Sequence, residues 1–119
     1  MNRDTANKII HEQIMNECWH DWEYVGLSAI LTARWVCSKC NANHESYTPK
    51  QPNYCNDANQ AVLVMGKCDI FDVIKPTGNC QWIATYQTGT ELSCAEASTF
   101  CLAICTAALG ILRIAEQIR

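Results

Sequence analysis

The sequence is poor in charge and lacks the composition of several protein classes. Charged residues make up 18% of the 119 residues, with nine basic against twelve acidic side chains and a net charge of -3. A chain of this sign offers no general electrostatic attraction to nucleic acid. Its three prolines and five glycines do not form a low-complexity tract, and its hydrophobic fraction of 49% is ordinary for a folded protein. We therefore expect a single globular domain over residues 1–119.

Long apolar segments are also missing. The longest uncharged run lies between Glu96 and Arg113. It is shorter than the roughly 20 residues that a membrane-spanning helix needs, and hydroxyl side chains interrupt it. Residues 1–8 are polar and lack the apolar stretch of a signal peptide. We therefore expect a cytoplasmic protein with no membrane partner, in a reducing compartment where cysteines stay as thiols.

Recognisable catalytic patterns are absent as well. The chain has no Gly-rich phosphate loop, no nucleophile elbow and no His-Glu-x-x-His helix. Its acidic residues are scattered, and solvated faces or helix caps account for such residues. We therefore expect a protein that is not an enzyme.

Cysteine is abundant by contrast, and four residues form a metal-binding pattern. The odd total of nine cysteines would leave one thiol over in a full disulfide framework. Cys18 and His20 are separated by one residue, and Cys37 and Cys40 enclose Ser-Lys. Four soft ligands in two close pairs suit a tetrahedral zinc ion. We predict a structural Zn²⁺ site at these four residues, because four protein ligands leave no position for water or substrate.

The local sequence supports this prediction and leaves two alternatives open. A strand would place the first pair of ligands on one face, and the turn that carries the second pair needs a left-handed residue after it, which Asn41 tolerates. His44 or Cys55 could replace one of the four ligands. A thioredoxin-like role for Cys37 and Cys40 would need a βαβ pattern, which the sequence does not have.

The other sulfur and aromatic side chains are explained by packing. Cys101 and Cys105 lie one helical turn apart on an apolar face, so we expect them in the core. Trp19, Trp22 and Trp35 could stack on a base or nucleotide. Packing in the core and beside the zinc site is the interpretation we favour, because large aromatic residues are usually mostly buried.

Apolar residues at helical spacing predict three helices, over residues 4–17, 56–66 and 95–115. Asp4 or Thr5 is expected to cap the first helix and Asn56 the second.

The remaining segments predict strands and loops. Residues 19–35 suit two strands with a turn at Gly26-Leu27-Ser28, and residues 41–56 suit a polar loop. Residues 70–75 and 81–87 predict a β-hairpin across Pro76-Thr77-Gly78-Asn79. Together these elements predict an α+β fold, a small α–β–α sandwich with a mostly antiparallel sheet and a zinc element over about residues 18–44.

Six short segments spread over most of the chain also carry a family resemblance. They are Asp4-Thr-Ala-Asn-Lys-Ile-Ile-His-Glu12, Cys18-Trp-His-Asp-Trp22, Trp35-Val-Cys-Ser-Lys-Cys40, Pro52-Asn-Tyr-Cys-Asn-Asp57, Glu96-Ala97 and Ala103-Ile-Cys-Thr-Ala-Ala-Leu109. Through them the chain resembles small bacteriophage and prophage proteins with the phage ABA sandwich domain, including members with a zinc-binding Cys-x-His…Cys-x-x-Cys element. The resemblance implies a three-layer α–β–α arrangement and a phage origin, and it implies no settled biochemical activity.

By analogy with such phage proteins, we expect a non-enzymatic protein that binds a host protein, for example an inhibitor of host defence such as an anti-CRISPR protein. One alternative is a sponge that captures a small nucleotide defence signal between subunits, which would make it a homo-oligomer. Another is a zinc-dependent nucleic-acid-binding module, against which the unclustered basic residues argue.

Overall fold

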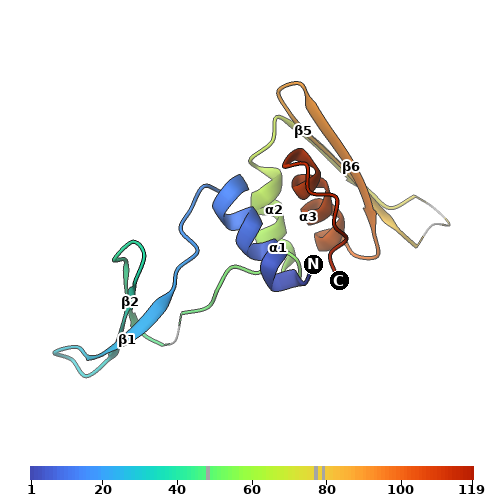
Figure 1. Cartoon of the computed structure of the whole chain (residues 1–119). Helices are drawn as coiled ribbons and strands as arrows, with labels where there is room; N and C mark the ends of the chain where they lie inside the picture. Colours follow the sequence, from blue (N-terminus) through green and yellow to red (C-terminus); the bar gives the residue numbers. More distant parts are fainter. Residues whose placement is uncertain (48, 77, 79) are drawn as a thin grey trace. The chain divides into compact units, whose positions relative to one another are not determined.

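The chain divides into two compact units. A computed structural model describes residues 1–47, 49–76, 78 and 80–119. The core unit comprises residues 1–16 and 52–119, and the small unit comprises residues 17–51 (Figure 1). The zinc element expected over residues 18–44 falls within the small unit, while folding as one domain stays a prediction. Thr48 of the expected polar loop, and Thr77 and Asn79 of the expected hairpin turn, lie outside the described residues.

The small unit contains a three-stranded antiparallel sheet in the order β1-β2-β3. Its strands are β1 (Trp22–Leu27), β2 (Ala33–Cys37) and β3 (Asn43–Ser46). The turn between β1 and β2 lies over residues 28–32, later than the expected Gly26-Leu27-Ser28. β3 lies in the segment expected to be a loop, because pairing with β2 supplies the order that its polar sequence does not indicate.

The core unit contains a second antiparallel sheet in the order β4-β5-β6. Its strands are β4 (Ile70–Ile74), β5 (Trp82–Thr88) and β6 (Glu91–Ala97). β4 and β5 pair with each other and confirm the predicted hairpin. β6 corrects the expectation of a helix from residue 95, because residues 91–97 pair with β5 along their whole length.

The predicted last helix is therefore shorter than expected. Helix α3 (Phe100–Ile111) begins after Thr99, whose side chain accepts a hydrogen bond from the Leu102 N–H, and Arg113 adopts a positive φ of 61° just beyond its end. Most of α3 is buried against β5 and β6. On the strand side, Tyr86 is buried and donates its hydroxyl to the Val64 carbonyl at 2.8 Å. Every residue from Cys101 to Leu109 except Thr106 is buried, so burial extends around the helix and is not confined to the one apolar face that the sequence predicted.

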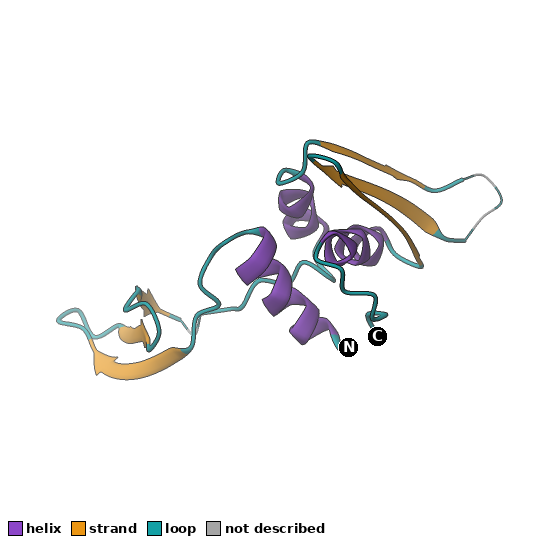
Figure 2. Ribbon diagram, turned by 45° about the horizontal axis from the view of Figure 1, so that its top comes forward, coloured by secondary structure: helices purple, strands orange, loops and turns teal. Residues whose placement is uncertain are grey.

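The other helical segments lie on the same side of the sheet as α3 (Figures 1 and 2). They are α1 (Arg3–Ile9), the π-helical turn η1 (Ile10–Ile14) and α2 (Ala58–Met65). Both η1 and α2 contact α3. All helices of this unit therefore lie on one side of the sheet, whereas the sequence predicted a sheet between helices. The α+β class, with antiparallel sheets and helices packed on a sheet, is confirmed.

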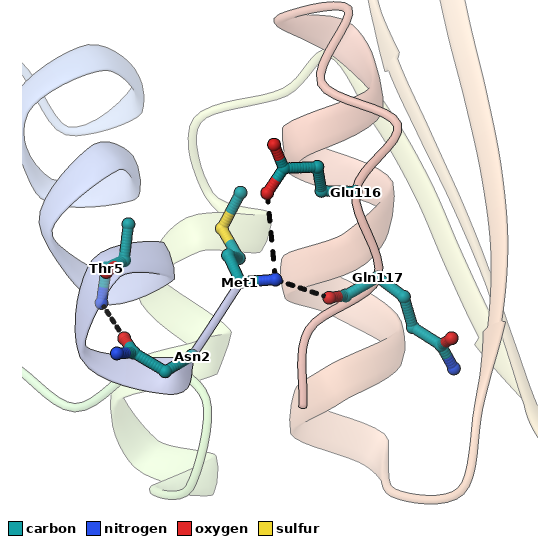
Figure 3. A network of polar contacts seen from close by, with 5 residues as sticks. All are labelled: Met1, Asn2, Thr5, Glu116 and Gln117. Carbon is teal, nitrogen blue, oxygen red and sulfur yellow. Dashed lines mark hydrogen bonds and ion pairs between the residues drawn. The ribbon is translucent and has the colours of Figure 1, made fainter.

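The N-caps of α1 and α2 are not the residues that the sequence predicted. Asn2 caps α1 by accepting from the Thr5 N–H at 2.8 Å, so neither Asp4 nor Thr5 is the cap (Figure 3). Asp57, not Asn56, caps α2 by accepting from the Asn59 N–H at 2.9 Å. Both caps are short side chains with an oxygen acceptor, which is the chemistry that the expected residues share.

The two ends of the chain meet in the core unit. The Met1 amino group donates to the Gln117 carbonyl at 2.9 Å and lies 3.6 Å from a Glu116 carboxylate oxygen (Figure 3). The Arg119 N–H donates to the Met1 carbonyl at 2.9 Å. Ile118 is buried in the core of this unit. These contacts hold the tail after α3 in place. No helix within the described part of the chain is long and apolar enough to cross a membrane.

Candidate metal centre

Four residues of the small unit gather their ligand atoms at one point. The sulfur atoms of Cys18, Cys37 and Cys40 and a ring nitrogen of His20 all lie within 4.8 Å of one another. Cys18 and His20 come from the segment before β1, and Cys37 ends β2 with Cys40 in the turn that follows. This group can hold a metal ion, and it unites the four residues that the sequence singled out.

The turn between the second pair of ligands is built as the sequence predicted. The Asn41 N–H donates to the Cys37 carbonyl at 2.9 Å, and the Cys37 N–H donates to the Ala42 carbonyl at 2.9 Å. Asn41 has a φ of 63°, which confirms the left-handed conformation expected after Cys40. The backbone therefore bends around the site by itself.

The first pair of ligands is held differently from the expectation. Cys18 and His20 precede β1 and are not in a strand. Hydrogen bonds tie their segment to the second pair: the Ser38 N–H donates to the Asp21 carbonyl at 3.0 Å, and the Ser38 hydroxyl donates to the Asp21 carboxylate at 3.2 Å. An irregular segment can aim two nearby side chains at one point without the alternation of a strand.

Two separations between ligand atoms are close to the edges of a tetrahedral zinc site. Zinc bonds of about 2.3 Å to sulfur and about 2.0 Å to nitrogen imply tetrahedron edges of about 3.8 Å between sulfurs and about 3.5 Å between sulfur and nitrogen. The Cys18 and Cys37 sulfurs are 3.9 Å apart, and the Cys40 sulfur lies 3.3 Å from His20 Nδ1. The donor set of three thiols and one imidazole is also one that zinc accepts.

The protein environment already favours one thiolate in this group. Burial acts on Cys37, but the Cys40 backbone N–H, the His20 ring and further backbone N–H groups outweigh it and lower the pKa of Cys37 to about 6. One of these is the Asp21 N–H, which donates to the Cys37 sulfur at 3.4 Å. Burial and the neighbouring thiols raise the pKa of Cys18 to about 11. A bound cation would deprotonate the remaining thiols, because coordination stabilises the thiolate.

Neither alternative ligand belongs to the group of four. Cys55 is buried in the core unit, where its backbone N–H donates to Asn7 Oδ1 at 3.0 Å. His44 lies in β3 beside the site, with its ring centroid 6.0 Å from that of Trp22. The ring centroids of Trp22 and His20 are in turn 4.5 Å apart. His44 therefore contacts the aromatic residue that packs on a candidate ligand.

Aromatic rings continue from the site across one face of this sheet. We call this set the aromatic face; it consists of Trp22, Tyr24, Trp35, His44 and Tyr47. Trp35 Nε1 and His44 Nε2 are buried, and neither has a hydrogen-bond partner among the described residues. The sequence indicated packing for Trp22 and Trp35, but it did not indicate that His44 joins them, because the pairing of β3 was not evident.

The remaining cysteines are not part of the site. Cys101 and Cys105 are buried on α3 among apolar neighbours, which confirms the predicted core packing. Burial raises the pKa of the Cys101 thiol, as expected for a sulfur in the core.

Comparison with known proteins supports the fold and gives no family. No protein-family model matches the chain, and no curated protein matches it. Among solved structures, a phage protein from Bacillus cereus ATCC 14579 superposes with a TM-score of 0.66 at 19% sequence identity. The match covers 98% of this chain and 93% of that one. At this identity the likeness shows a shared fold, and the resemblance to the phage ABA sandwich family is not confirmed.

Proposed function

From the shared fold and the four-ligand group, we propose that the chain is a small phage-encoded binding protein with a structural zinc site. Its action is non-enzymatic, in the cytoplasm of an infected cell, where it binds a host protein and inhibits host defence in the manner of an anti-CRISPR protein. It belongs, in this proposal, to the phage ABA sandwich family. The observation that carries the proposal is the gathering of four protein ligands within 4.8 Å.

A structural role suits this site better than a catalytic one. Catalytic zinc sites use three protein ligands and keep one position for water or substrate, whereas four protein ligands close the coordination sphere. Cys18, His20, Cys37 and Cys40 would occupy all four positions. The ion would then hold the segment before β1 against the end of β2, and the function would be carried out by the surface that it stabilises.

The strongest candidate for that surface is the turn between β1 and β2. Ile30 and Leu31 are 77% and 76% exposed there, and Leu27 is exposed beside them. Hydrogen bonds close the turn, since the Ser28 N–H donates to the Thr32 carbonyl at 2.8 Å and their hydroxyls lie 2.6 Å apart. Leu31 has a φ of 63°, a conformation that costs free energy in a residue other than glycine. A fixed turn therefore presents two aliphatic side chains to solvent.

The chemistry of this turn indicates what it would bind. No residue from Val25 to Ala33 is charged. Burying such a turn in an apolar pocket removes hydrocarbon from water without burying an unpaired charge. We therefore propose that Ile30 and Leu31 insert into an apolar pocket of the host protein.

Changing the turn tests this function. Host proteins that co-purify with the tagged chain would be compared with those that co-purify with Ile30→Asp/Leu31→Asp. We expect a host protein recovered with the unchanged chain to fall about tenfold or more with the variant, because the variant would bury two charges in the pocket. The matched control is Val62→Asp/Leu63→Asp, which places two charges on the exposed side of α2.

The control variant should recover the same host protein as the unchanged chain. Equal recovery by the turn variant, or recovery of no host protein above background at physiological salt, would contradict the proposal.

The aromatic face supports a second candidate, capture of a small nucleotide. Tyr24 and Tyr47 are more than half exposed, and rings of this kind stack on bases. Trp35 Nε1 and His44 Nε2, which have no partner among the described residues, could form hydrogen bonds with a ligand after a local rearrangement. Native mass spectrometry after exposure to extract of infected cells tests this candidate, and a chain that stays unliganded contradicts it.

A further inference from the structure

One face of the sheet in the core unit is not covered by the helices. Tyr86 and Ala84 of β5 are each 2% exposed and lie on the side packed by α3. Because side chains alternate along a strand, Ile83, Thr85 and Gln87 lie on the opposite side. Their paired residues on β4 and β6 lie there too. This open face consists of Ile70, Asp72, Ile74, Ile83, Thr85, Gln87, Leu92, Cys94 and Glu96.

The contacts and exposures agree with this assignment. The Thr85 hydroxyl lies 3.7 Å from the Cys94 sulfur, so these paired residues share one side of the sheet. Ile70, Ile74 and Leu92 are 59%, 48% and 62% exposed. The solvent side of an antiparallel sheet is normally polar, whereas four of the nine residues here are large and aliphatic. Exposed aliphatic residues gathered in this way mark a binding surface.

The charges of the open face restrict what can cover it. Asp72 lies on β4 between two isoleucines, and Glu96 lies on β6. Neither a lysine nor an arginine is among the nine residues of the face. Two copies of the chain packed through this face would bring carboxylates together with no basic residue to pair them, which disfavours a symmetric dimer. A partner with basic side chains beside an apolar stripe is complementary.

The spacing of the aliphatic residues suits a helix. Ile70 and Ile74 are four residues apart on one strand, a separation of about 13 Å. A stripe at i, i+4 and i+8 on an α-helix covers about 12 Å. Three strands span about 10 Å across the sheet, close to the diameter of a helix with its side chains.

We propose that the open face binds an amphipathic α-helix of a partner protein, with an aliphatic stripe over Ile70, Ile74, Ile83 and Leu92. Lysine or arginine residues flank the stripe and pair with Asp72 and Glu96. The bound helix forms a third layer on the free side of the sheet. This site lies in the core unit and does not depend on the turn of the small unit that the proposed function uses.

Synthetic peptides test this proposal on the full chain with its metal. The probe is a peptide of about 18 residues with leucines at i, i+4, i+7 and i+11 and lysines beside them. One control has the same composition in an order without the stripe, and another has glutamate for lysine. By calorimetry we expect the striped lysine peptide to bind about tenfold or more tightly than either control. Hydrogen exchange should slow in β4, β5 and β6.

Variants locate the binding. Ile74→Ser/Leu92→Ser should weaken it about tenfold or more, and Asp72→Asn/Glu96→Gln should weaken it and reduce its dependence on salt. Val62→Ser/Leu63→Ser on α2 and Ile30→Asp/Leu31→Asp in the small unit should leave it unchanged, so this proposal and the proposed function fail separately. Melting curves check that each variant is folded.

Equal binding of the peptide without the stripe, protection outside the three strands, or no binding at millimolar peptide would overturn the proposal. Dimerisation of the chain through the same face, detected by sedimentation and removed by Ile74→Ser/Leu92→Ser, would also overturn it.

Discussion

Removing the metal is expected to unfold the small unit and to leave the core unit folded. Among the described residues of this unit, Cys37 is the one buried hydrophobic residue. The apolar cluster that stabilises the molecule contains residues of the core unit only. A sheet of three short strands without its own core is marginal in water. Zinc binding to comparable small elements contributes about 10–16 kcal/mol at neutral pH, enough to determine whether they fold.

Hydrogen exchange measures this effect unit by unit. With a strong chelator, the amides of β1, β2 and β3 should exchange as in an unfolded chain, while those of α3 and β5 stay protected. Cys37→Ser should behave as the chelated protein does, because it removes one of four ligands. Cys80→Ser is the matched control, since Cys80 is an exposed thiol outside the site. Protection of the small unit that survives both the chelator and Cys37→Ser would contradict the structural role of the metal.

The second large effect is expected from Gly110→Val, where α3 lies against Ser93 of β6. A Cβ at Gly110 would overlap the Ser93 hydroxyl and lie 3.1 Å from the Ser93 Cβ. Rotation of Ser93 can move the hydroxyl but not the Cβ, so a branched side chain would force α3 away from β6. We expect a loss of about 3 kcal/mol in the free energy of unfolding. The melting temperature of the core unit should fall on the order of 15 °C.

A double-mutant cycle shows whether Ser93 is the cause. Ser93→Gly removes the side chain that the introduced valine would meet, so adding it to Gly110→Val should restore at least about 1 kcal/mol beyond the sum of the single changes. Gly66→Ala is a control at a helix end where an added Cβ makes an ordinary contact of 3.4 Å. If the effects of Gly110→Val and Ser93→Gly on the free energy of unfolding are additive, the contact with Ser93 is not what destabilises the valine variant.

The ligand group could be predicted because its information is local. Cys37 and Cys40 are close in sequence, and the turn between them needs one residue in a left-handed conformation, which Asn41 supplies. The β-hairpin of β4 and β5 was equally local. Branched and aromatic runs with turn residues between them identify such a hairpin without knowledge of the rest of the fold.

What the sequence did not reveal depends on pairing between strands. β6 has Leu92, Cys94 and Glu96 on one side and the small residues Ser93, Ala95 and Ala97 on the other. Alanine and glutamate are also common in helices, so the end of this strand resembles the start of the helix that follows it. The small residues are needed because α3 packs closely against this side of β6. That contact joins two separate elements, so the local sequence does not reveal it. Likewise, β3 is polar, and only its register with β2 places His44 beside Trp35.

In the proposed site, three sulfurs and one nitrogen of the small unit hold one zinc ion with no open position. X-ray absorption at the zinc edge, on protein purified without added metal, tests it most directly. We expect about one zinc per chain with three sulfur neighbours at about 2.3 Å and one nitrogen at about 2.0 Å. Protein without zinc, or zinc with oxygen in place of a sulfur, would contradict it.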